Sequence, residues 1–541
     1  MTNKNIENLF KWAHSLKDKK INGKSFYKYF EYNGINLWWF CIIGICQEAL
    51  QYSKEVPIPK KELNLRKNIY PKVEIFIDIF QKVIGKLFYI GYKKQNKPCV
   101  FVTGDRYWKA VYNSEKECYE QIDDFFQPVM DQIKEKDIPY LSIGELQMMQ
   151  NRSFNPLKML LHRKLRKPDI PYASIESFWN FKIFAEQIKA KKNFRNVWNG
   201  IKDKKDFKNL LYGYDKVLGE RLYNYFEYYF LTVLPRKIKL LEMSKNFIEQ
   251  VKPRVIVLQN ERAGWEQTLV CAAKEKGIKT IAIQHGVVYR LHEGYFQIKE
   301  EREDKTKADI FCIYGPETEK VLKSMHYNPK KLVVVGQPRY DKISLYENSN
   351  IRERFIKEND LHKDKKIFMI ATQPLLEGLR KQYFRNVLNV LKKLNVQIVV
   401  KPHPLEEDLT FYEEEIKKQN VKAKILQNKA DTFEALSSCD FFTTFSSTTA
   451  LEAMLFEKPV FIFNFTDEAG TLPWVKGGAA ISFKNEKTAE NYLKKVINNP
   501  KILKNLLKKE KEFLEKYYYK IDGKASNRIY QLIEKFQNGN K

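Results

Sequence analysis

Short apolar runs alternate with amphipathic segments along the chain from Val255 onward. The first runs are RVIVLQN, KTIAIQHG, DIFCIYG and LVVVGQP, and ERAGWEQTLVCAAKEKG between the first two has apolar residues at helical spacing. After GQPRYDKISLYENSN the rhythm restarts with KIFMIATQP, VQIVVKPHP, AKILQ, FFTTFSS, PVFIFNF and AAISF. Strands that alternate with helices predict βαβ units and parallel sheets. We therefore predict an α/β protein with two doubly wound domains and a linker near residues 336–350.

The remaining parts of the chain have a different pattern. Residues 1–245 are mixed, with aromatic-rich helical segments and one strand with its turn, PCVFVTGDRYW. We predict that they form part of an acceptor-side domain with a helical extension, that 246–345 and 346–485 are Rossmann-like, and that the Lys-rich tail 486–541 is helical. The stretch INLWWFCIIGICQEAL is shorter than the roughly 20 residues of a membrane span, which indicates a buried helix instead.

The composition narrows the class of protein. The 541 residues are 43% hydrophobic and carry a formal net charge of +29. This charge fits solvated helix faces, attraction to an anionic membrane surface or small anions, or nucleic acid. No nucleic-acid motif supports the last option, so we expect no specific nucleic-acid partner. The seven cysteines form no C-x-x-C pair, which indicates buried thiols and no metal site. The N-terminus lacks the apolar core of a signal peptide, so we expect a cytoplasmic protein.

Polar side chains stand where the predicted strands end. Ligands of open parallel sheets bind beyond the carboxyl ends of the strands, and five such ends together favour a ligand cleft between the two sheets. The five are Gln259-Asn260-Glu261, Gln284-His285-Gly286, Thr372-Gln373-Pro374, Lys401-Pro402-His403-Pro404 and Ser446-Ser447-Thr448-Thr449.

Each strand end also has a simpler explanation. Lys401 and His403 suit phosphate oxygens, but they also fit an ordinary polar loop. Ser446 and Ser447 before a helix suit an anion, whereas Thr449 and Glu452 alone would form a capping box. We read those two serines as phosphate-binding while the capping box stays open.

Four further residues are weighed as catalytic or structural. His285 beside Gly286 suits a reacting group, or a core histidine bonded to backbone. Glu261 is a candidate general base, or a helix cap. Asp105 and Asp341 have similar standing to Glu261, with Asp341 more structural at the linker. P-loop, G-x-G-x-x-G, G-x-S-x-G and H-E-x-x-H motifs are all missing.

The motifs IAIQHG, GQPRYD, VVKPHP and SSTTALEAMLFEKPV, in this order, resemble the GT-B glycosyltransferases of bacterial surface polysaccharide synthesis. This superfamily includes polysialyltransferases and Kdo transferases of the capsule type, and the CDP-glycerol glycerophosphotransferases of teichoic acid synthesis share the pattern. The resemblance covers roughly residues 250–485. It implies two Rossmann-like domains facing a cleft, with the nucleotide held mainly by the second.

The resemblance also implies roles for individual residues. Donor phosphate would be bound by Lys401, His403, Ser446, Ser447 and Thr448, with His285 near the reacting group. Glu452 would meet the ribose, and Thr372 and Gln373 would line the cleft beside the leaving group. Such fixed donors stabilise the charge that develops on the leaving nucleotide without a metal, so we expect no cofactor beyond the donor itself.

The resemblance favours a transferase that uses a CMP-, CDP- or UDP-linked sugar and a glycan or lipid-linked acceptor. A phosphotransferase that uses a CDP-polyol is the alternative. An epimerase and a non-catalytic scaffold of glycan assembly are the lesser ones. Peripheral contact with the inner face of the membrane stays open.

Overall fold

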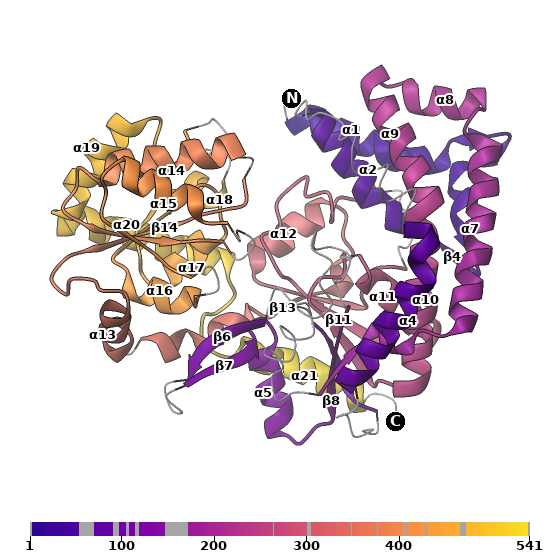
Figure 1. The fold of residues 1–541 in the computed structure, drawn as a ribbon, viewed down its shortest axis with the longest axis horizontal. Coiled ribbons are helices and arrows are strands. Elements are labelled where there is room, and N and C mark those ends of the chain that lie inside the picture. The colour runs from indigo at the N-terminus through magenta and orange to yellow at the C-terminus, as the bar shows by residue number, and fades with distance from the viewer. Residues whose placement is uncertain are drawn as a thin grey trace.

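In the computed structural model, two parallel sheets form the centres of two domains, which lie side by side in Figure 1. The structure describes residues 3–53, 70–89, 97–103, 108–113, 118–145, 171–262, 264–299, 305–347, 349–375, 377–403, 406, 408–427, 430–465 and 472–538.

The first domain is built on a seven-stranded sheet in which all neighbouring strands are parallel. Its spatial order is β13 (Leu332–Val334), β12 (Ile310–Ile313), β11 (Lys279–Ile283), β10 (Val255–Leu258), β5 (Cys99–Val102), β8 (Tyr140–Gly144) and β9 (Tyr172–Ser174). The strand order reverses between β5 and β10, as in a doubly wound fold. Because β5, β8 and β9 precede residue 246, the sheet extends beyond the 246–345 range indicated by the strand rhythm.

The second domain is built on a six-stranded parallel sheet. Its order is β16 (Ala423–Ile425), β15 (Gln397–Lys401), β14 (Ile367–Ala371), β17 (Phe441–Thr444), β18 (Val460–Ile462) and β19 (Ile481–Ser482). The order reverses between β14 and β17. Both sheets thus have the winding of a dinucleotide-binding fold, and the predicted α/β architecture with two Rossmann-like domains is confirmed.

Helices occupy most of the gaps between strands, as the amphipathic segments predict. In the first domain these are α5 (Gln127–Glu135), α11 (Glu266–Glu275) and α12 (Pro316–Ser324). In the second domain they are α13 (Ser349–Glu358), α14 (Glu377–Leu391), α15 (Thr410–Lys418), α16 (Thr432–Ser438), α17 (Thr449–Leu455) and α18 (Pro473–Lys476). The helices α19 (Glu486–Ile497) and α20 (Pro500–Tyr517) follow the last strand, in the tail that the sequence predicts to be helical. Gly277 follows α11 with a φ of +68°, a left-handed conformation that glycine adopts without strain.

A helical extension packs onto the first domain. It contains α1 (Asn3–Ser15), α2 (Trp38–Ser53), α4 (Tyr70–Tyr89), α7 (Phe181–Ile201), α8 (Lys205–Tyr212), α9 (Lys216–Tyr228) and α10 (Leu234–Val251). Short two-stranded hairpins, β1 (Lys20–Ile21) with β2 (Lys24–Ser25) and β3 (Glu31–Tyr32) with β4 (Ile35–Asn36), lie between α1 and α2.

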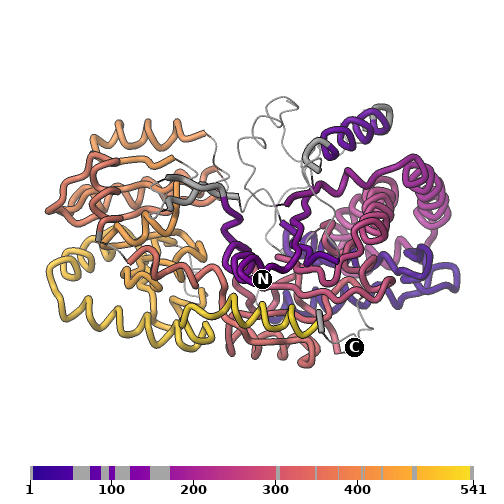
Figure 2. The backbone as a smooth tube through the Cα atoms, turned by 90° about the horizontal axis from the view of Figure 1, so that it is seen from below, coloured from indigo at the N-terminus to yellow at the C-terminus, as the bar shows by residue number. Residues whose placement is uncertain are grey.

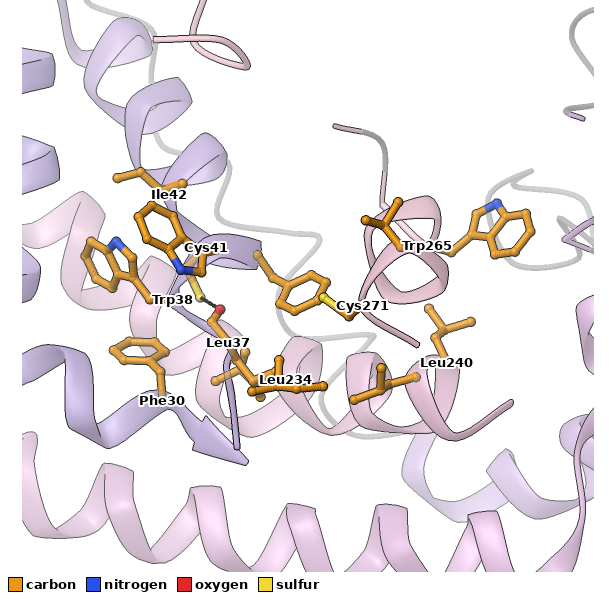
Figure 3. Close-up of a cluster of buried hydrophobic side chains, with 14 of the residues drawn as sticks. Phe30, Leu37, Trp38, Cys41, Ile42, Leu234, Leu240, Trp265 and Cys271 are labelled. Carbon is orange, nitrogen blue, oxygen red and sulfur yellow. Dashed lines mark hydrogen bonds between the residues drawn. The ribbon is translucent and has the colours of Figure 1, made fainter. Parts of the chain in front are cut away.

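The core of this extension is continuous with the core of the first domain. Trp38 and Ile42 of α2 are buried in one cluster with Leu234 of α10 and Cys271 of α11 (Figure 3). The Cys41 thiol donates a hydrogen bond to the Leu37 carbonyl at 3.5 Å. The expected buried helix in INLWWFCIIGICQEAL is therefore confirmed. Within the described residues, no helix is both long and apolar enough to cross a membrane.

Two segments join the domains. The predicted linker contains the 3-10 helix η7 (Pro338–Tyr346), whose residues Tyr340, Ile343 and Tyr346 are buried in the core of the second domain. The helix α21 (Ala525–Asn538) leaves the second domain and packs on α5 of the first, and Figure 2 shows it as the yellow helix near the lower edge. Asp341 accepts bonds from the backbone N–H groups of Ala525 (3.1 Å) and Ser526 (2.7 Å). Its expected structural role is thus confirmed.

Candidate functional site

The carboxyl ends of β14 and β17 are joined by Gln373 at the point where the strand order of the second sheet reverses. The Gln373 amide oxygen accepts a hydrogen bond from the Ser446 backbone N–H at 2.8 Å, and the Thr444 hydroxyl lies 3.3 Å from the same oxygen. This is the position where open α/β sheets bind ligands. Gln373 therefore orders the loop after β17 from the neighbouring strand.

The loop after β17 leads into the short helix α17. Ser447 Oγ accepts a hydrogen bond from the Thr449 backbone N–H at 3.2 Å, so this hydroxyl orders the first turn. Thr448 is exposed and is the N-cap residue, and its side chain makes no capping bond. The capping box that Thr449 and Glu452 could form is not present, because Glu452 is paired elsewhere. Ser446 and Thr448 thus lie at the edge of the sheet, next to the first N–H groups of α17.

The exit of β15 carries Lys401 and His403. Lys401 is 4% exposed, and its ammonium donates to the Pro402 carbonyl at 3.0 Å. The backbone N–H of His403 lies 3.1 Å from Thr372 Oγ1 and 3.0 Å from Glu406 Oε2. The β15 exit is therefore tied to the β14 exit, and the half-buried His403 side chain stands on a fixed loop.

Glu406 organises this loop and is not evident as a site residue from the sequence. It is buried and accepts hydrogen bonds from the hydroxyl groups of Thr372 and Tyr412. Arg380 lies 3.6 Å from its Oε1. Thr372, which we expected to line the cleft beside the leaving group, instead has its hydroxyl bonded to Glu406. Its role here is to hold the loop that presents His403.

In the first domain, His285 follows β11 and is half-buried. The Asn260 amide nitrogen, from the exit of β10, lies 3.3 Å from His285 Nε2. The Gln284 side chain donates to the Gly286 carbonyl at 2.7 Å and accepts from the Tyr314 backbone N–H at 2.8 Å. Three neighbouring strand exits are therefore bonded together around this histidine.

The loop after His285 faces the second domain. Val287 packs against the buried cluster that includes Tyr340 and Phe433. His285 thus lies close to the junction of the two domains, as expected for a group that acts on a ligand of the second domain. The convergence of His285 and His403 on one diphosphate stays a prediction.

The structure places Glu261, which we expected as a general base, in a buried position with partners of its own. Glu261 is 0% exposed, and its two carboxylate oxygens accept hydrogen bonds from the Tyr327 hydroxyl and from the Ala308 backbone N–H (2.8 Å). A base must reach the proton that it removes. Glu261 instead ties the exit of β10 to the segments on either side of β12.

Glu452 also differs from its expected role at the ribose. Its carboxylate is paired with the Arg339 guanidinium, whose Nε lies 2.8 Å from Asp124 Oδ2. Arg339 also stacks over the Phe433 ring, with 4.4 Å between its Cζ and the ring centroid. Burial lowers the pKa of Arg339, but Asp124 and Glu452 outweigh burial, so this pKa lies above its ordinary value. Glu452 is thus part of an ion cluster that joins the domains.

Among the residues that the structure describes, cysteines and metal-ligating side chains do not add a second candidate centre. The six cysteines whose side chains the structure describes are all buried and unbridged. In the part of the chain that the structure describes, no group of three or more His, Cys, Asp or Glu side chains could hold a metal ion. Asp105 lies outside the described residues.

The model of the LIC12162 family transferases matches residues 90–473. The chain belongs to this family of transferases. It is therefore an enzyme of the transferase class. The matched range contains the whole first sheet and the strands β14–β18 of the second. No curated protein matches the sequence.

Solved structures similar to this LIC12162 family transferase are distant in sequence. The wall teichoic acid polymerase TagF is 13% identical, over 89% of this chain and 99% of that chain, with a TM-score of 0.49. A putative UDP-N-acetylglucosamine 2-epimerase from Listeria monocytogenes is 12% identical, over 83% and 98%, with a TM-score of 0.49. The S. aureus MnaA–UDP structure is 14% identical, over 82% and 97%, with a TM-score of 0.48.

Some site residues of this transferase are not evident from the sequence. Most of them are bonding partners of residues that the sequence does reveal. Glu406 lies in the same loop as His403, and a carboxylate three residues after a strand-end histidine is the one local signal for it. Arg339 stands in the motif GQPRYD, but its partners Asp124 and Glu452 are far away along the chain. Such pairs become visible only in the folded molecule.

Proposed function

We propose that the protein transfers a sugar from a nucleotide-activated donor to a surface polysaccharide or to a lipid-linked glycan acceptor. The observation that carries this proposal is the assembly of Gln373, His403 and Ser446 at the reversal point of the second sheet. Membership of a transferase family supports the reaction class. The resemblance of the motifs to GT-B enzymes supports the donor class.

The donor phosphates would lie at the exits of β14, β15 and β17. The His403 imidazole, the Ser446 hydroxyl and the first N–H groups of α17 are hydrogen-bond donors to phosphate oxygens. The buried Lys401 ammonium adds positive charge beneath the same loop, where the low dielectric strengthens its effect. Because these groups are held by Gln373 and Glu406, they need little reorganisation when charge develops on the leaving nucleotide. We propose no resident cofactor or metal.

The acceptor hydroxyl must lose a proton, and we assign this step to His285 instead of Glu261. An imidazole can take a proton near neutral pH. Asn260 acts as a positioning residue: its amide nitrogen, which can only donate, lies 3.3 Å from His285 Nε2, and the acceptor hydroxyl would take its place when Nε2 receives the proton. The loop that carries His285 faces the second domain through Val287, which supports a position next to the donor.

A phosphotransferase that uses a CDP-polyol is the second candidate. The proposed cradle recognises phosphate, and none of its groups selects a sugar over a phosphopolyol. In that case the same residues would bind the donor, and the bond that breaks would be within the diphosphate. For either donor, we place the enzyme at the inner face of the membrane, where a lipid-linked acceptor would be available.

The nucleotide class is tested by binding of CMP, CDP, UDP and GDP, measured by calorimetry and by thermal shift. A ligand that binds only the native state raises the melting temperature according to its concentration over its dissociation constant. We expect one base to be preferred. The matching nucleotide sugar and CDP-glycerol, each radiolabelled, then decide between the sugar donor and the polyol donor.

The cradle is tested with His403→Ala, Ser446→Ala and the control His362→Ala. His362 is an exposed histidine of the same domain, and its hydrogen bonds with Gln397 are made by its backbone. We expect His403→Ala to weaken nucleotide binding by roughly tenfold to a hundredfold, because a hydrogen bond to a charged group is lost, and His362→Ala to leave it unchanged. Equal affinity of His403→Ala and the wild type would overturn the proposed cradle.

A further inference from the structure

The helix α4 has its polar side facing inward and its apolar side facing outward. Glu74, Asp78 and Gln81 are 9%, 3% and 8% exposed. On the opposite side Phe76, Ile79, Phe80 and Val83 are 70%, 38%, 37% and 53% exposed. A surface helix normally buries its apolar side, so the orientation of α4 is reversed.

Paired charges hold α4 in this orientation. Asp78 lies 2.7 Å from the ammonium of Lys239 on α10, and Glu74 accepts a hydrogen bond from Gln187 of α7 at 2.6 Å. Lys191 lies 3.7 Å from Glu74. Turning the helix to bury its apolar side would break these contacts and leave Lys239 buried without its carboxylate, which is costly. The outward apolar side is therefore a fixed feature of the fold.

The neighbouring helix α7 adds to the apolar surface. Phe181 and Ile188 are 65% and 52% exposed. Phe181 contacts the Trp179 ring, over which the ammonium of Lys82 from α4 lies, and Ile188 follows the Gln187 that bonds to Glu74. These contacts place both residues beside α4. We call the surface formed by Phe76, Ile79, Phe80, Val83, Phe181 and Ile188 the α4 patch.

Lysines surround the α4 patch. Lys86, Lys182, Lys189 and Lys192 are exposed and Lys82 is half-buried, whereas the acidic residues Glu74 and Asp78 face inward. An apolar strip bordered by lysines is the pattern of a helix that lies in the interface of an anionic bilayer. A second copy of the chain would bring like charges together around the strip, which opposes a dimer at this surface.

We propose that the α4 patch docks on the surface of a bilayer that contains anionic phospholipid. The apolar side chains enter the boundary between headgroups and acyl chains, and the surrounding lysines contact the headgroup phosphates. α4 would lie parallel to the bilayer, because its exposed apolar side chains run along one side of the helix from Phe76 to Val83. In Figure 2 the helix lies at the periphery of the first domain, on the upper right.

Docking in this orientation brings the carboxyl edge of the first sheet close to the membrane. A Cβ on Gly85 of α4 would lie only 2.8 Å from Ser177 Oγ and 3.4 Å from Ser174 Cβ, so the helix is in close contact with the end of β9. The surface is separate from the nucleotide cradle, and the inference does not depend on which donor the enzyme uses.

The test is sedimentation of the full chain with vesicles of phosphatidylcholine alone and with vesicles of phosphatidylcholine and phosphatidylglycerol in equal parts. We expect binding to the anionic vesicles only. The double variant Phe76→Gln/Phe80→Gln should bind them at least about tenfold more weakly, because two apolar anchors are removed. The control is Leu345→Gln, a similarly exposed apolar residue of the linker (65%), and it should bind like the wild type.

Further measurements test the contribution of the lysines and the position of α4 on the bilayer. Lys86→Glu/Lys189→Glu should weaken binding to anionic vesicles, and added salt should do the same. Amide hydrogen exchange in residues 74–86 should slow when anionic vesicles are added. Unchanged nucleotide binding of each variant reports that it is folded.

The proposal is overturned if the wild type does not bind anionic vesicles or if Phe76→Gln/Phe80→Gln binds as well as Leu345→Gln. It is also overturned if the wild type is a dimer that the double variant converts to a monomer, since a second copy would then cover the patch. We expect His403→Ala to lose nucleotide binding but to bind vesicles like the wild type. Failure of the membrane surface and failure of the proposed function are therefore distinguishable.

Discussion

At the scale of single residues, buried polar side chains near the strand exits serve mainly to hold one another. Glu406 bonds to Thr372 and to the backbone of His403, and Gln373 bonds to the backbone of Ser446. Polar groups buried at a sheet edge need partners, because an unmade hydrogen bond there costs more than a made one contributes. Groups that touch a ligand are therefore fewer than the polar residues at the edge, and they stand on a bonded framework.

Glu261 belongs to this framework, so we expect its substitution to lower the stability of the fold and to leave ligand binding unchanged. Glu261→Ala leaves the Tyr327 hydroxyl and the Ala308 N–H without their acceptor, so we expect a loss of about 2–4 kcal/mol in the free energy of unfolding. Nucleotide affinity should not change. Chemical denaturation measures the loss, with the exposed Glu515→Ala on α20 as control, expected within about 0.5 kcal/mol of the wild type. If Glu261→Ala were as stable as the wild type but had lost turnover, Glu261 would have to be the general base.

His285 and Asn260 should act as one unit in catalysis. We expect His285→Ala to lower kcat by roughly a hundredfold to ten-thousandfold, as for loss of a general base, and Asn260→Ala by a smaller factor. The double variant should be no slower than His285→Ala, because Asn260 acts only through the histidine. Steady-state kinetics with the preferred donor gives these values. If the two decreases in kcat instead multiply in the double variant, Asn260 has a role of its own.

At the scale of elements, the apolar runs predict well where the strands lie, but they do not predict which strands pair with each other. The runs from Val255 to AAISF correspond to β10–β19, and the predicted helices correspond to α11 and α14. The short strands β8 and β9 carry weak patterns, and β5 pairs with β10, which lies more than a hundred residues later. Periodicity reports how a segment is buried, but pairing depends on contacts between distant segments.

The same limit applies to the candidate site. Lys401, His403 and Ser446 can be placed at strand ends because strand ends are local features. The partners of Glu261 and Glu452 could not be foreseen, because Tyr327 and Arg339 lie 66 and 113 residues away. A carboxylate at a strand end has the same local sequence whether it meets a ligand, a tyrosine or an arginine.

The last residue of β7 (Cys118–Asp123), just before α5, is a carboxylate that should make stability depend on pH. Asp123 is 0% exposed, and one of its oxygens accepts hydrogen bonds from the backbone N–H groups of Phe125 (3.0 Å) and Phe126 (2.9 Å). Burial raises the pKa of Asp123 from 3.8 to about 7, although these two bonds lower it. Below the ordinary pKa the carboxyl is protonated in both the folded and the unfolded state. As the pH rises, the unfolded chain ionises first, so the contribution of Asp123 falls between about pH 4 and pH 7 and is constant above.

Asp123→Asn keeps an acceptor oxygen and removes the titration. Relative to the wild type it should gain stability across this window, by at most about 4 kcal/mol for a shift of this size. Urea denaturation at several pH values measures the difference, and Asp137→Asn, an exposed residue after the same helix, should follow the wild type. A difference that does not change with pH would contradict the raised pKa.

At the scale of the whole molecule, the two domains are joined by the chain at η7, by α21 and by the cluster of Asp124, Arg339 and Glu452. Asp124 stands between β7 (Cys118–Asp123), which pairs with β6 (Trp108–Asn113), and α5 of the first domain. Glu452 belongs to α17 of the second. One guanidinium therefore neutralises carboxylates from both domains. Because α17 also begins at the Ser446 loop, the contact between domains is mechanically continuous with the proposed phosphate cradle.

Arg339→Met should loosen the domains. The substitution keeps an apolar stem against Phe433 but leaves Asp124 and Glu452 as like charges in a poorly solvated place, so we expect a stability loss of about 3–5 kcal/mol. We also expect a larger radius of gyration in X-ray scattering, since these two carboxylates repel across the domain junction. Arg339→Lys should recover only part of the effect, because an ammonium lacks the fork that meets two carboxylates at once. The matched control is Arg354→Met, which breaks an arginine–glutamate pair with Glu434 (2.6 Å) inside the second domain. That variant should lose stability at an unchanged radius of gyration, whereas equal radii for both variants would mean that η7 and α21 alone hold the domains together.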